Sequence, residues 1–331
     1  MRAIVGVVLV GLIAWCGYWV WGARAKSAAV EAWFEARRAE GWQADHAGIS
    51  VRGFPSRFDT VIDAPLLADP ETGLLFSAPE MRLVMLAYRP THVIALLPET
   101  WRIATPQDKI DVTSPDLRAS LVLAPGLALE AERITIAGTQ LRLAAQSGWQ
   151  VAAPELSLAA ERQAGEGDAQ YRIGLAAEDI RLDPAPRSLR DGLPDSLGAL
   201  RLDMDAAFDR PWDRRALEDA RPQPRLLDIR LARASWGALE LAATGEMEID
   251  ARGTPDGDLT LQARNWRAML ALAAEAGALP EVLVDQIAGG LGLLAGLSGN
   301  PDRLELPLRF DDGQTRLGPI TLGPAPRIRL R

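Results

Sequence analysis

Hydrophobic and polar positions alternate with a period of two over most of the chain, from residue 42 to about residue 258. The residues between the apolar ones are mostly Arg, Glu, Asp, Thr, Ser or Ala, so each predicted strand has one apolar and one solvated face, as in antiparallel sheets. Turn signals such as Pro125-Gly126 and Asp256-Gly257 separate these runs. The pattern therefore predicts a mainly β body. Ten alternating positions are predicted to line its apolar face: Leu121, Leu123, Ile134, Ile136, Leu141, Leu143, Leu156, Leu158, Ile173 and Leu175.

Many one-sided strands must cover their apolar faces, and the chain offers few helices for that purpose. We therefore expect an elongated, curled antiparallel sheet. A fully closed sheet would enclose a packed core, whereas an open or hollow one would leave an apolar lining that suits acyl chains. Aromatic residues make up only 6% of the chain, so the lining is mostly Leu, Ile and Ala and leaves room in the interior.

A short repeat punctuates the alternating region. The segments around Pro79, Pro115 and Pro154 all read Ala/Ser-Pro-Glu/Asp-Met/Leu, at spacings of 36 and 39 residues. Proline lacks an N–H group and is tolerated at the entry of a strand, so these prolines mark strand starts. Repetition at this spacing predicts stacked hairpins. The alternative is that Pro-Glu-Leu is simply a common strand opener in a proline-rich chain.

The N-terminus has a different pattern. Residues 3–23 carry no charge, and these 21 residues would form a helix of about 31 Å, close to the thickness of one hydrocarbon core. Arg24 and Lys26 end the run. We expect residues 1–24 to be an uncleaved transmembrane anchor. Four aromatic residues at the end of the run are predicted to lie at the membrane interface: Trp15, Tyr18, Trp19 and Trp21.

Two other interpretations of this segment are weaker. Ala23-Arg24-Ala25 offers a small-x-small cleavage site, but the apolar run is long for a signal peptide and bulky aromatics precede the site. Cys16 follows Trp15, where a lipoprotein signal would need a small residue. Positive charges on the two sides of the run are nearly balanced, so they do not decide its orientation.

The rest of the chain divides into further segments. Residues 25–41 predict an amphipathic helix with Val30, Trp33, Phe34 and Arg37 on one stripe and Gly41 as its stop. A β-rich body is expected over residues 42–331. Within the body we expect a seam over 184–224, which includes the exposed charged loop 209–215, then C-terminal helices over 265–297 and a closing hairpin over 303–323.

Composition excludes several classes of function. The net charge is −8, which disfavours a nucleic-acid-binding domain, and one Cys with two His excludes disulfide scaffolds, Cys/His zinc sites and iron–sulfur clusters. Gly290 and Gly292 fit a dinucleotide-binding pattern, but they lie in an apolar helical stretch where small-residue packing is the better interpretation. Asp203 and Asp205 are expected on the solvated face of a strand. We therefore expect no catalytic residues, no metal site, no cofactor and no enzymatic activity.

Three motifs occur in order along the chain. They are Gly53-Phe54-Pro55-Ser56-Arg57-Phe58, the proline-opened strands, and the ending that carries Gly313, Leu317, Gly318 and Pro319. With these motifs the chain resembles the proteobacterial envelope family called domain of unknown function 2125 (DUF2125), and more loosely the AsmA and TamB type of envelope protein. The resemblance implies a single-pass inner-membrane protein with its body in the periplasm and a β-sheet groove for lipid. It implies no catalytic residue.

Two functions are therefore expected. The first is binding or shuttling of phospholipid in an apolar β-groove, for envelope homeostasis. Arg52 and Arg57 near the membrane end could then meet lipid phosphate, although an ordinary solvated pair is the simpler interpretation. The alternative is a structural or adaptor protein that docks an envelope protein through sheet edges or through loop 209–215.

Overall fold

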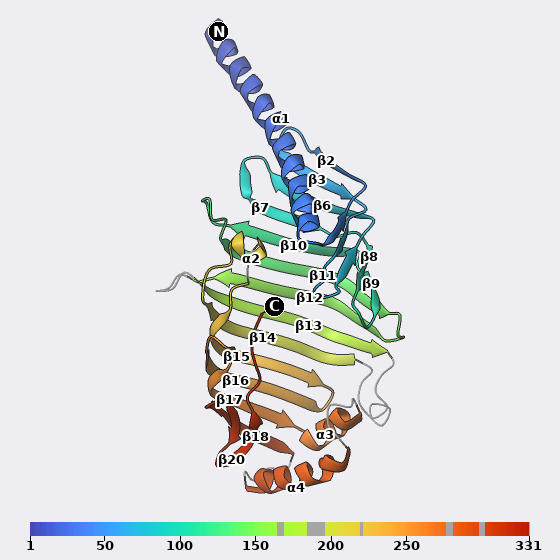
Figure 1. Ribbon diagram of the computed structural model, residues 1–331, viewed down its shortest axis with the longest axis vertical. Helices are drawn as coiled ribbons and strands as arrows, with labels where there is room; N and C mark the ends of the chain where they lie inside the picture. The colour runs from blue at the N-terminus through green and yellow to red at the C-terminus, as the bar shows by residue number, and fades with distance from the viewer. Residues whose placement is uncertain (164–168, 184–195, 219–220, 276–280, 298–301, 331) are drawn as a thin grey trace. The chain divides into compact units, whose positions relative to one another are not determined.

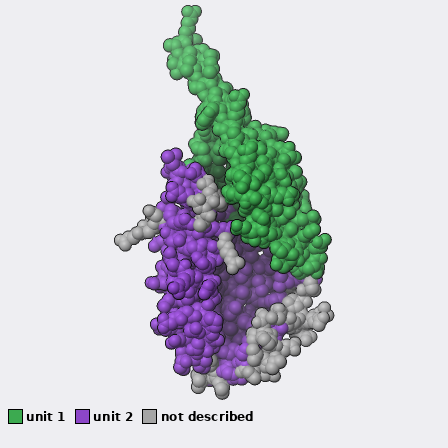
Figure 2. All heavy atoms as spheres, viewed as in Figure 1, with its two compact units in different colours: residues 1–123, 136–149 green, residues 124–135, 150–331 purple. Residues whose placement is uncertain are grey.

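The chain folds into two units, each built on antiparallel strands (Figures 1 and 2). The computed structural model describes residues 1–163, 169–183, 196–218, 221–275, 281–297 and 302–330. Unit 1 contains residues 1–123 and 136–149, and unit 2 contains residues 124–135 and 150–331. The predicted mainly β, antiparallel fold with an N-terminal helix and two C-terminal helices is confirmed.

The N-terminal helix α1 (Arg2–Ala39) is continuous over 38 residues. It joins the predicted anchor and the predicted amphipathic helix, because no proline or helix-breaking turn separates them. The helix ends at Glu40, and Gly41 follows with a left-handed φ of 89°. Figure 1 shows the N-terminal half of α1 extending away from the strands of unit 1.

Unit 1 contains two antiparallel ladders. The first runs through β1 (Gln43–Asp45), β4 (Leu66–Ala68), β5 (Leu75–Ser77), β8 (Thr100–Ala104), β9 (Lys109–Thr113) and residues 142–145 of β11 (Ala131–Ala145). The second runs through β2 (Gly48–Arg52), β3 (Arg57–Asp63), β6 (Glu80–Leu86), β7 (Arg89–Leu96) and β10 (Asp116–Leu123).

Prolines mark the bends where the chain passes from one ladder of unit 1 to the other. Pro65, Pro79, Pro98 and Pro115 each lie between a strand of one ladder and the next strand of the other. Neighbouring bends are joined, since the N–H of Ala64 donates to the carbonyl of Pro79 at 2.9 Å. Because proline donates no ladder bond, each bend interrupts pairing where the strand changes ladder.

Unit 2 is a meander in which each strand pairs with the next (Figure 1). Its last pairings are likewise sequential, and among the described residues no pairing joins its two edges. Its strands are β12 (Gln150–Arg162), β13 (Gln170–Asp183), β14 (Ser196–Phe208), β15 (Pro224–Trp236), β16 (Leu239–Ile249), β17 (Pro255–Arg264), β18 (Arg303–Asp311), β19 (Gln314–Leu317) and β20 (Ile320–Pro324).

The expected seam over 184–224 is not where the chain divides. Strand β14 lies inside this stretch and pairs with β13 on one side and with β15 on the other, over most of its length. The strands before and after this stretch therefore belong to the same unit, unit 2. Among the described residues of the stretch, a short helix, α2 (Arg215–Glu218), follows the loop after β14; residues 184–195 and 219–220 lie outside the described residues.

Two long strands explain a change of phase in the hydrophobic pattern. Gln140 in β11 and Asp179 in β13 have left-handed φ angles of 48° and 51°. One such residue shifts the side-chain alternation by one position, as a β-bulge does. The even-numbered pair Ile134/Ile136 and the odd-numbered pair Leu141/Leu143 therefore belong to one strand.

The C-terminal segments cover the last strands of unit 2. Helices α3 (Trp266–Glu275) and α4 (Glu281–Leu297) lie where they were predicted, and Trp266, Ala295 and Leu304 form a buried cluster between them and β18. The closing hairpin is a three-stranded ribbon instead, because Gly318-Pro319 makes a second turn between β19 and β20. Residues 325–328 then return over a second cluster around Phe310.

Gly245 provides a test of this packing. A Cβ atom at Gly245 in β16 would lie 2.2 Å from the carbonyl oxygen of Asp258, so the backbones must separate to accept it. We expect Gly245→Ala to destabilise the protein by about 2 kcal/mol, the order of a local backbone strain. At Gly174 in β13 the nearest atom is 3.9 Å away, and Gly174→Ala should be neutral or slightly stabilising.

The measurement is thermal unfolding of the full chain in detergent, followed by circular dichroism. Equal midpoints for the two variants would contradict the close approach of β16 and β17.

Candidate functional site

The apolar half of α1 ends in aromatic side chains that bind the body of unit 1. The indole N–H of Trp15 donates to the carbonyl of Pro55 at 3.1 Å, and that of Trp19 donates to the carbonyl of Arg57 at 2.8 Å. The hydroxyl of Tyr18 donates to the carbonyl of Ala87 at 2.7 Å. Three backbone carbonyls of two neighbouring turns are thus satisfied by one face of the helix.

The rings of these residues pack around Phe58, which is 2% exposed. Trp19 stacks on Phe58 with ring centroids 5.7 Å apart, and Tyr18 meets Phe58 edge-on at 6.3 Å. Gly22 lies directly against the Phe58 ring, and the ammonium of Lys26 lies 5.5 Å from its centroid. Burial lowers the pKa of Lys26. We call Trp15, Tyr18, Trp19 and Phe58 the aromatic collar.

The collar changes the interpretation of the predicted membrane-interface residues. Trp15, Tyr18 and Trp19 bind carbonyls of the body, whereas Trp21 is 70% exposed. An amphipathic aromatic side chain suits a membrane interface and a protein surface equally well, so its position in the sequence cannot distinguish the two. The stripe of the second helical segment also differs from expectation, since Phe34 is buried but Trp33 is 41% exposed.

The motif residues at Gly53-Phe54-Pro55 and Arg57 form the β2–β3 turn beneath the collar. Gly53 has a φ of 101°, and a Cβ atom there would lie 3.0 Å from the carbonyl oxygen of Arg57, so the turn requires glycine. Arg57 pairs with Asp59 at 2.9 Å. The other motif residues lie far along the chain: Gly313 in the β18–β19 turn, Leu317 at the end of β19, and Gly318 with Pro319 in the β19–β20 turn.

Unit 2 presents a continuous apolar face. Pairing places one residue from each of seven strands in a single row across the sheet, and every member of this row is only half-buried. A neighbouring row has the same aliphatic character, with Ile173, Met204 and Ile229 among its members. The first row consists of Leu158, Leu175, Leu202, Ala232, Ala243, Leu261 and Leu306.

The predicted groove residues are divided between the two units. Leu156, Leu158, Ile173 and Leu175 lie on this face of unit 2. Ile134 also belongs to unit 2, and the remaining five residues belong to unit 1: Leu121, Leu123, Ile136, Leu141 and Leu143. All ten are half-buried.

Cover on the apolar face of unit 2 is uneven. The two buried clusters of unit 2 draw on β15 to β18, with α3, α4 and residues 325–328 packed against them. On β13 and β14, loop 209–215 covers the end of the face near Tyr171 and Phe208. In the described ranges, no residue of the row that runs through Leu158, Leu175 and Leu202 belongs to a buried cluster on β12 to β14. The aliphatic rows of these three strands are therefore the least covered part of the face.

The opposite face of the same strands is a lattice of cross-strand ion pairs. Arg172 donates to Asp203, with a closest distance of 2.8 Å, and this hydrogen bond holds the pKa of Asp203 below its ordinary value. Arg230, the extra residue at an irregularity between β14 and β15, pairs with Asp205. Asp203 and Asp205 thus lie on the solvated face, each with its own arginine, and form no shared acid–base pair.

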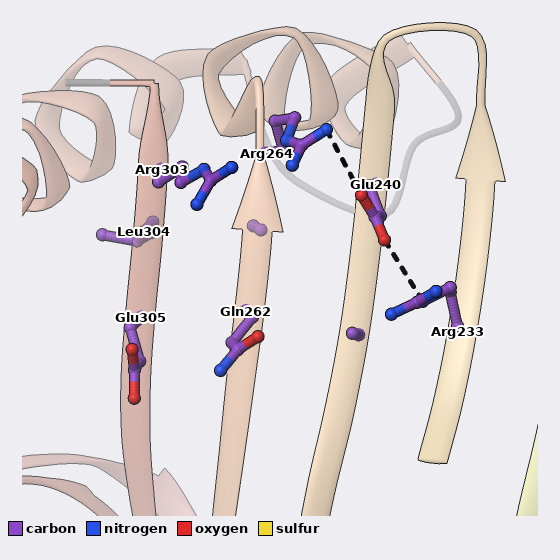
Figure 3. A pocket seen from close by; sticks show the side chains of 9 residues that line it. Arg233, Glu240, Gln262, Arg264, Arg303, Leu304 and Glu305 are labelled. Carbon is purple, nitrogen blue, oxygen red and sulfur yellow. Dashed lines mark ion pairs between the residues drawn. The ribbon is translucent and has the colours of Figure 1, made fainter. Parts of the chain in front are cut away.

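A cavity of about 490 Å³ lies on this charged face, over β15 to β18 (Figure 3). Glu240 points between two guanidinium groups, at 3.1 Å from Arg233 and 3.6 Å from Arg264. Both arginines are about half exposed, so these pairs contribute little to stability. Glu240 also offsets part of the positive charge of the two arginines, and the cavity lies on the face opposite the aliphatic rows.

The remaining sequence candidates have ordinary partners. His46 lies 3.2 Å from Glu31, and His92 lies 2.8 Å from Ser120. Gly290 and Gly292 lie inside α4 and not at a strand-to-helix turn, so the dinucleotide pattern lacks its structural context. Among the described residues, no group of three or more His, Cys, Asp or Glu side chains could hold a metal ion.

The charged loop at 209–215 is packed against other parts of unit 2. The Trp212 ring meets the Phe208 ring edge-on, with centroids 5.6 Å apart. The backbone carbonyl of Trp212 accepts a hydrogen bond from the N–H of Ala131 at 2.7 Å. The hydroxyl of Tyr171 donates to the carbonyl of Ala131 and accepts from the N–H of Trp212, and burial raises the pKa of Tyr171. Sequence analysis treated this loop as exposed and missed Trp212 as its anchor.

Fold and helix together define a mainly β protein with an N-terminal helix long and apolar enough to anchor it in a membrane. The chain belongs to the family described as uncharacterized protein conserved in bacteria (DUF2125), whose model matches residues 19–326. No curated protein and no solved structure matches the chain. The looser resemblance to AsmA and TamB proteins stays a prediction.

The contact between Gly22 and Phe58 can be tested against a neighbouring glycine of the same helix. A Cβ atom at Gly22 would lie 2.7 Å from the Phe58 ring, while Gly17 has nothing within 4 Å. We expect Gly22→Val to displace the helix from the body and to destabilise the protein by about 1–3 kcal/mol, the usual cost of overpacking. Gly17→Val should have little effect.

Thermal unfolding in detergent and limited proteolysis in the β2–β3 turn both report this change. Equal stability of the two variants would mean that the collar does not hold the helix.

Proposed function

We propose that this chain is a membrane-tethered, non-enzymatic protein that binds phospholipid acyl chains on the apolar face of unit 2. The observation that carries the proposal is the pair of half-buried aliphatic rows over β12 to β14. Neighbouring strands are about 4.8 Å apart, so a row across seven strands extends about 29 Å. Each methylene group that the face removes from water contributes about 0.8 kcal/mol.

The presence of two alanines among the leucines of the row supports an aliphatic ligand. Ala232 and Ala243 lie beside Leu202 and Leu261 in the same row, and small side chains leave shallow space between large ones. The row contains no aromatic side chain, and its backbone polar groups are paired within the ladder. An extended acyl chain needs a surface of this kind and no specific polar partner.

We propose that α1 is the uncleaved tether. Its first turns carry exposed aliphatic side chains, such as Ile4 (69%), Val7 (73%) and Val10 (68%), which a bilayer would cover. Cleavage after Ala25 would remove the donors to the carbonyls of the body and would uncover Phe58. This cost favours an anchor over a signal peptide.

The family resemblance supports an inner-membrane location with the body in the periplasm. The one cysteine, Cys16, lies in the anchor segment, so the body contains no thiol that an oxidising compartment would affect.

Docking of an envelope protein is the second candidate, and edge strand β20 favours it. Ile320 and Leu322 on this strand are 58% and 56% exposed, and an edge strand can accept a further strand. Loop 209–215 supports docking less well than its charge suggested, because Trp212 packs into unit 2.

Adjacent residues on opposite faces of β14 test the lipid proposal. Leu202 lies in the aliphatic row, and Arg201 lies on the charged face beside Glu178. We expect a photoreactive phenylalanine analogue at position 202 to form adducts with phospholipid after irradiation of bacterial membranes. The same analogue at position 201 should form at least fivefold fewer adducts. Mass spectrometry of the purified full chain measures both.

Equal lipid adducts at the two positions would contradict the proposal. A protein adduct at position 202 would instead favour the docking alternative.

The tether has its own test. Full chain produced in a bacterial host should keep residues 1–23 by intact mass and should stay in the membrane after alkaline carbonate extraction. Trp19→Ala removes one donor and one stacked ring but leaves the apolar run, so the variant should remain membrane-bound while its body unfolds at lower temperature. A mature protein that begins after Ala25 would contradict the tether.

A further inference from the structure

We propose that the two turns beneath the aromatic collar insert into the membrane interface and form a second contact between unit 1 and the bilayer. These turns are the β2–β3 turn at residues 53–56 and the β6–β7 turn at residues 87–88. The proposal rests on the uncleaved tether and adds a surface that the tether alone does not require.

The length of free helix carries the first step. The collar begins at Trp15, so only residues 2–14 of α1 lie beyond the first hydrogen bond to the body. Thirteen residues of helix are about 20 Å long, while a hydrocarbon core is about 30 Å thick. The apolar run of residues 3–23 therefore cannot span the core unless the collar and its turns enter the membrane.

The two turns lie together at one end of the β3–β6 pair. Arg57 is opposite Leu86 in the ladder, and the N–H of Ala87 donates to the carbonyl of Ser56 at 2.8 Å. Each turn has one large, partly exposed aromatic side chain. Phe54 is 54% exposed and meets Trp19 edge-on at 5.4 Å, and Tyr88 is 67% exposed. Aromatic side chains are favoured at the interface between headgroups and acyl chains.

The collar also removes an obstacle to insertion. An unpaired carbonyl is costly in a low-dielectric medium, and turns leave carbonyls unpaired. Here the carbonyls of Pro55, Arg57 and Ala87 accept hydrogen bonds from α1. The turns can therefore enter the interface with these three groups already satisfied.

Positively charged residues flank the two turns in the sequence and are available for phosphate groups. Arg52 and Arg89 are exposed, and neither makes an ion pair within the part of the chain that the structure describes. Guanidinium groups bind phosphate well. A long arginine side chain can also extend to the headgroups when its own backbone lies at a different depth in the membrane. The surface therefore fits a phospholipid bilayer: two aromatic tips with arginines beside them.

Depth-dependent quenching tests this proposal in the full chain. In a Cys16→Ser background, single cysteines are placed by Phe54→Cys, Tyr88→Cys or, as the control, Gln107→Cys in the exposed β8–β9 turn of unit 1. Each is labelled with a polarity-sensitive fluorophore and reconstituted into vesicles of phosphatidylethanolamine and phosphatidylglycerol. We expect a lipid nitroxide near the headgroup to quench the labels at 54 and 88 at least threefold more than the label at 107.

Intact mass and carbonate extraction of the same samples separate the two proposals. If α1 is retained but the labels at positions 54 and 88 are quenched no more than the label at 107, the proposal that the turns insert is wrong and the proposed tether stands. If α1 is cleaved, the collar is lost and both proposals fall. Unfolding midpoints within 2 °C of the parent confirm that each labelled variant is folded.

Discussion

The contact between α1 and Phe58 is the interaction on which the N-terminal unit depends. One half of α1 is apolar and exposed, and the other half packs on unit 1. The helix must therefore be attached to unit 1 at the boundary between the two halves. Trp19 and Tyr18 surround the buried Phe58 ring and donate to carbonyls of the turns beside it. Farther along the helix, Phe34 completes the attachment in a buried cluster with Ala44 and Ile62, which come from the two different ladders. The helix thus joins both ladders of unit 1.

Unit 2 meets a different constraint, because long amphipathic strands leave one apolar face for every charged one. The charged face is neutralised by cross-strand pairs such as Arg172–Asp203 and Arg201–Glu178, which fix the register more than they stabilise, since they are exposed. The apolar face is covered over the last strands by α3, α4 and the C-terminal segment. On strands β12 to β14, loop 209–215 covers the end near Tyr171 and Phe208, and the rows through Leu158, Leu175 and Leu202 stay half-buried. The lipid proposal follows from this imbalance.

Periodicity predicted what depends on local pattern. The strands of unit 2 and the C-terminal helices follow directly from alternation and from helix-forming composition. Periodicity could not predict contacts between distant residues. The tryptophans of α1 donate to carbonyls about 40 residues away, and the sequence does not distinguish these carbonyls from those of any other turn. Pro65 and Pro98 belong to the same series of bends as Pro79 and Pro115, but Pro65 is followed by Leu66 and Pro98 is preceded by Leu97. Neither carries the full Ala/Ser-Pro-Glu/Asp-Met/Leu motif, so only part of the series was visible. The seam was misplaced because proline and charge also occur in loops between paired strands.

Under the lipid proposal, the continuity of α1 bears on whether the chain would carry lipid away from the membrane or hold it there. A protein that shuttles cargo away from a membrane needs a flexible connection between its anchor and its binding surface. Here α1 runs from Arg2 to Ala39 without a proline, and the docked stretch begins at Trp15, inside the apolar run. No flexible linker separates the apolar half of α1 from the strands of unit 1, so the proposed tether would hold unit 1 at the membrane surface. Binding or local presentation of lipid is therefore more consistent with this tether than long-range transport.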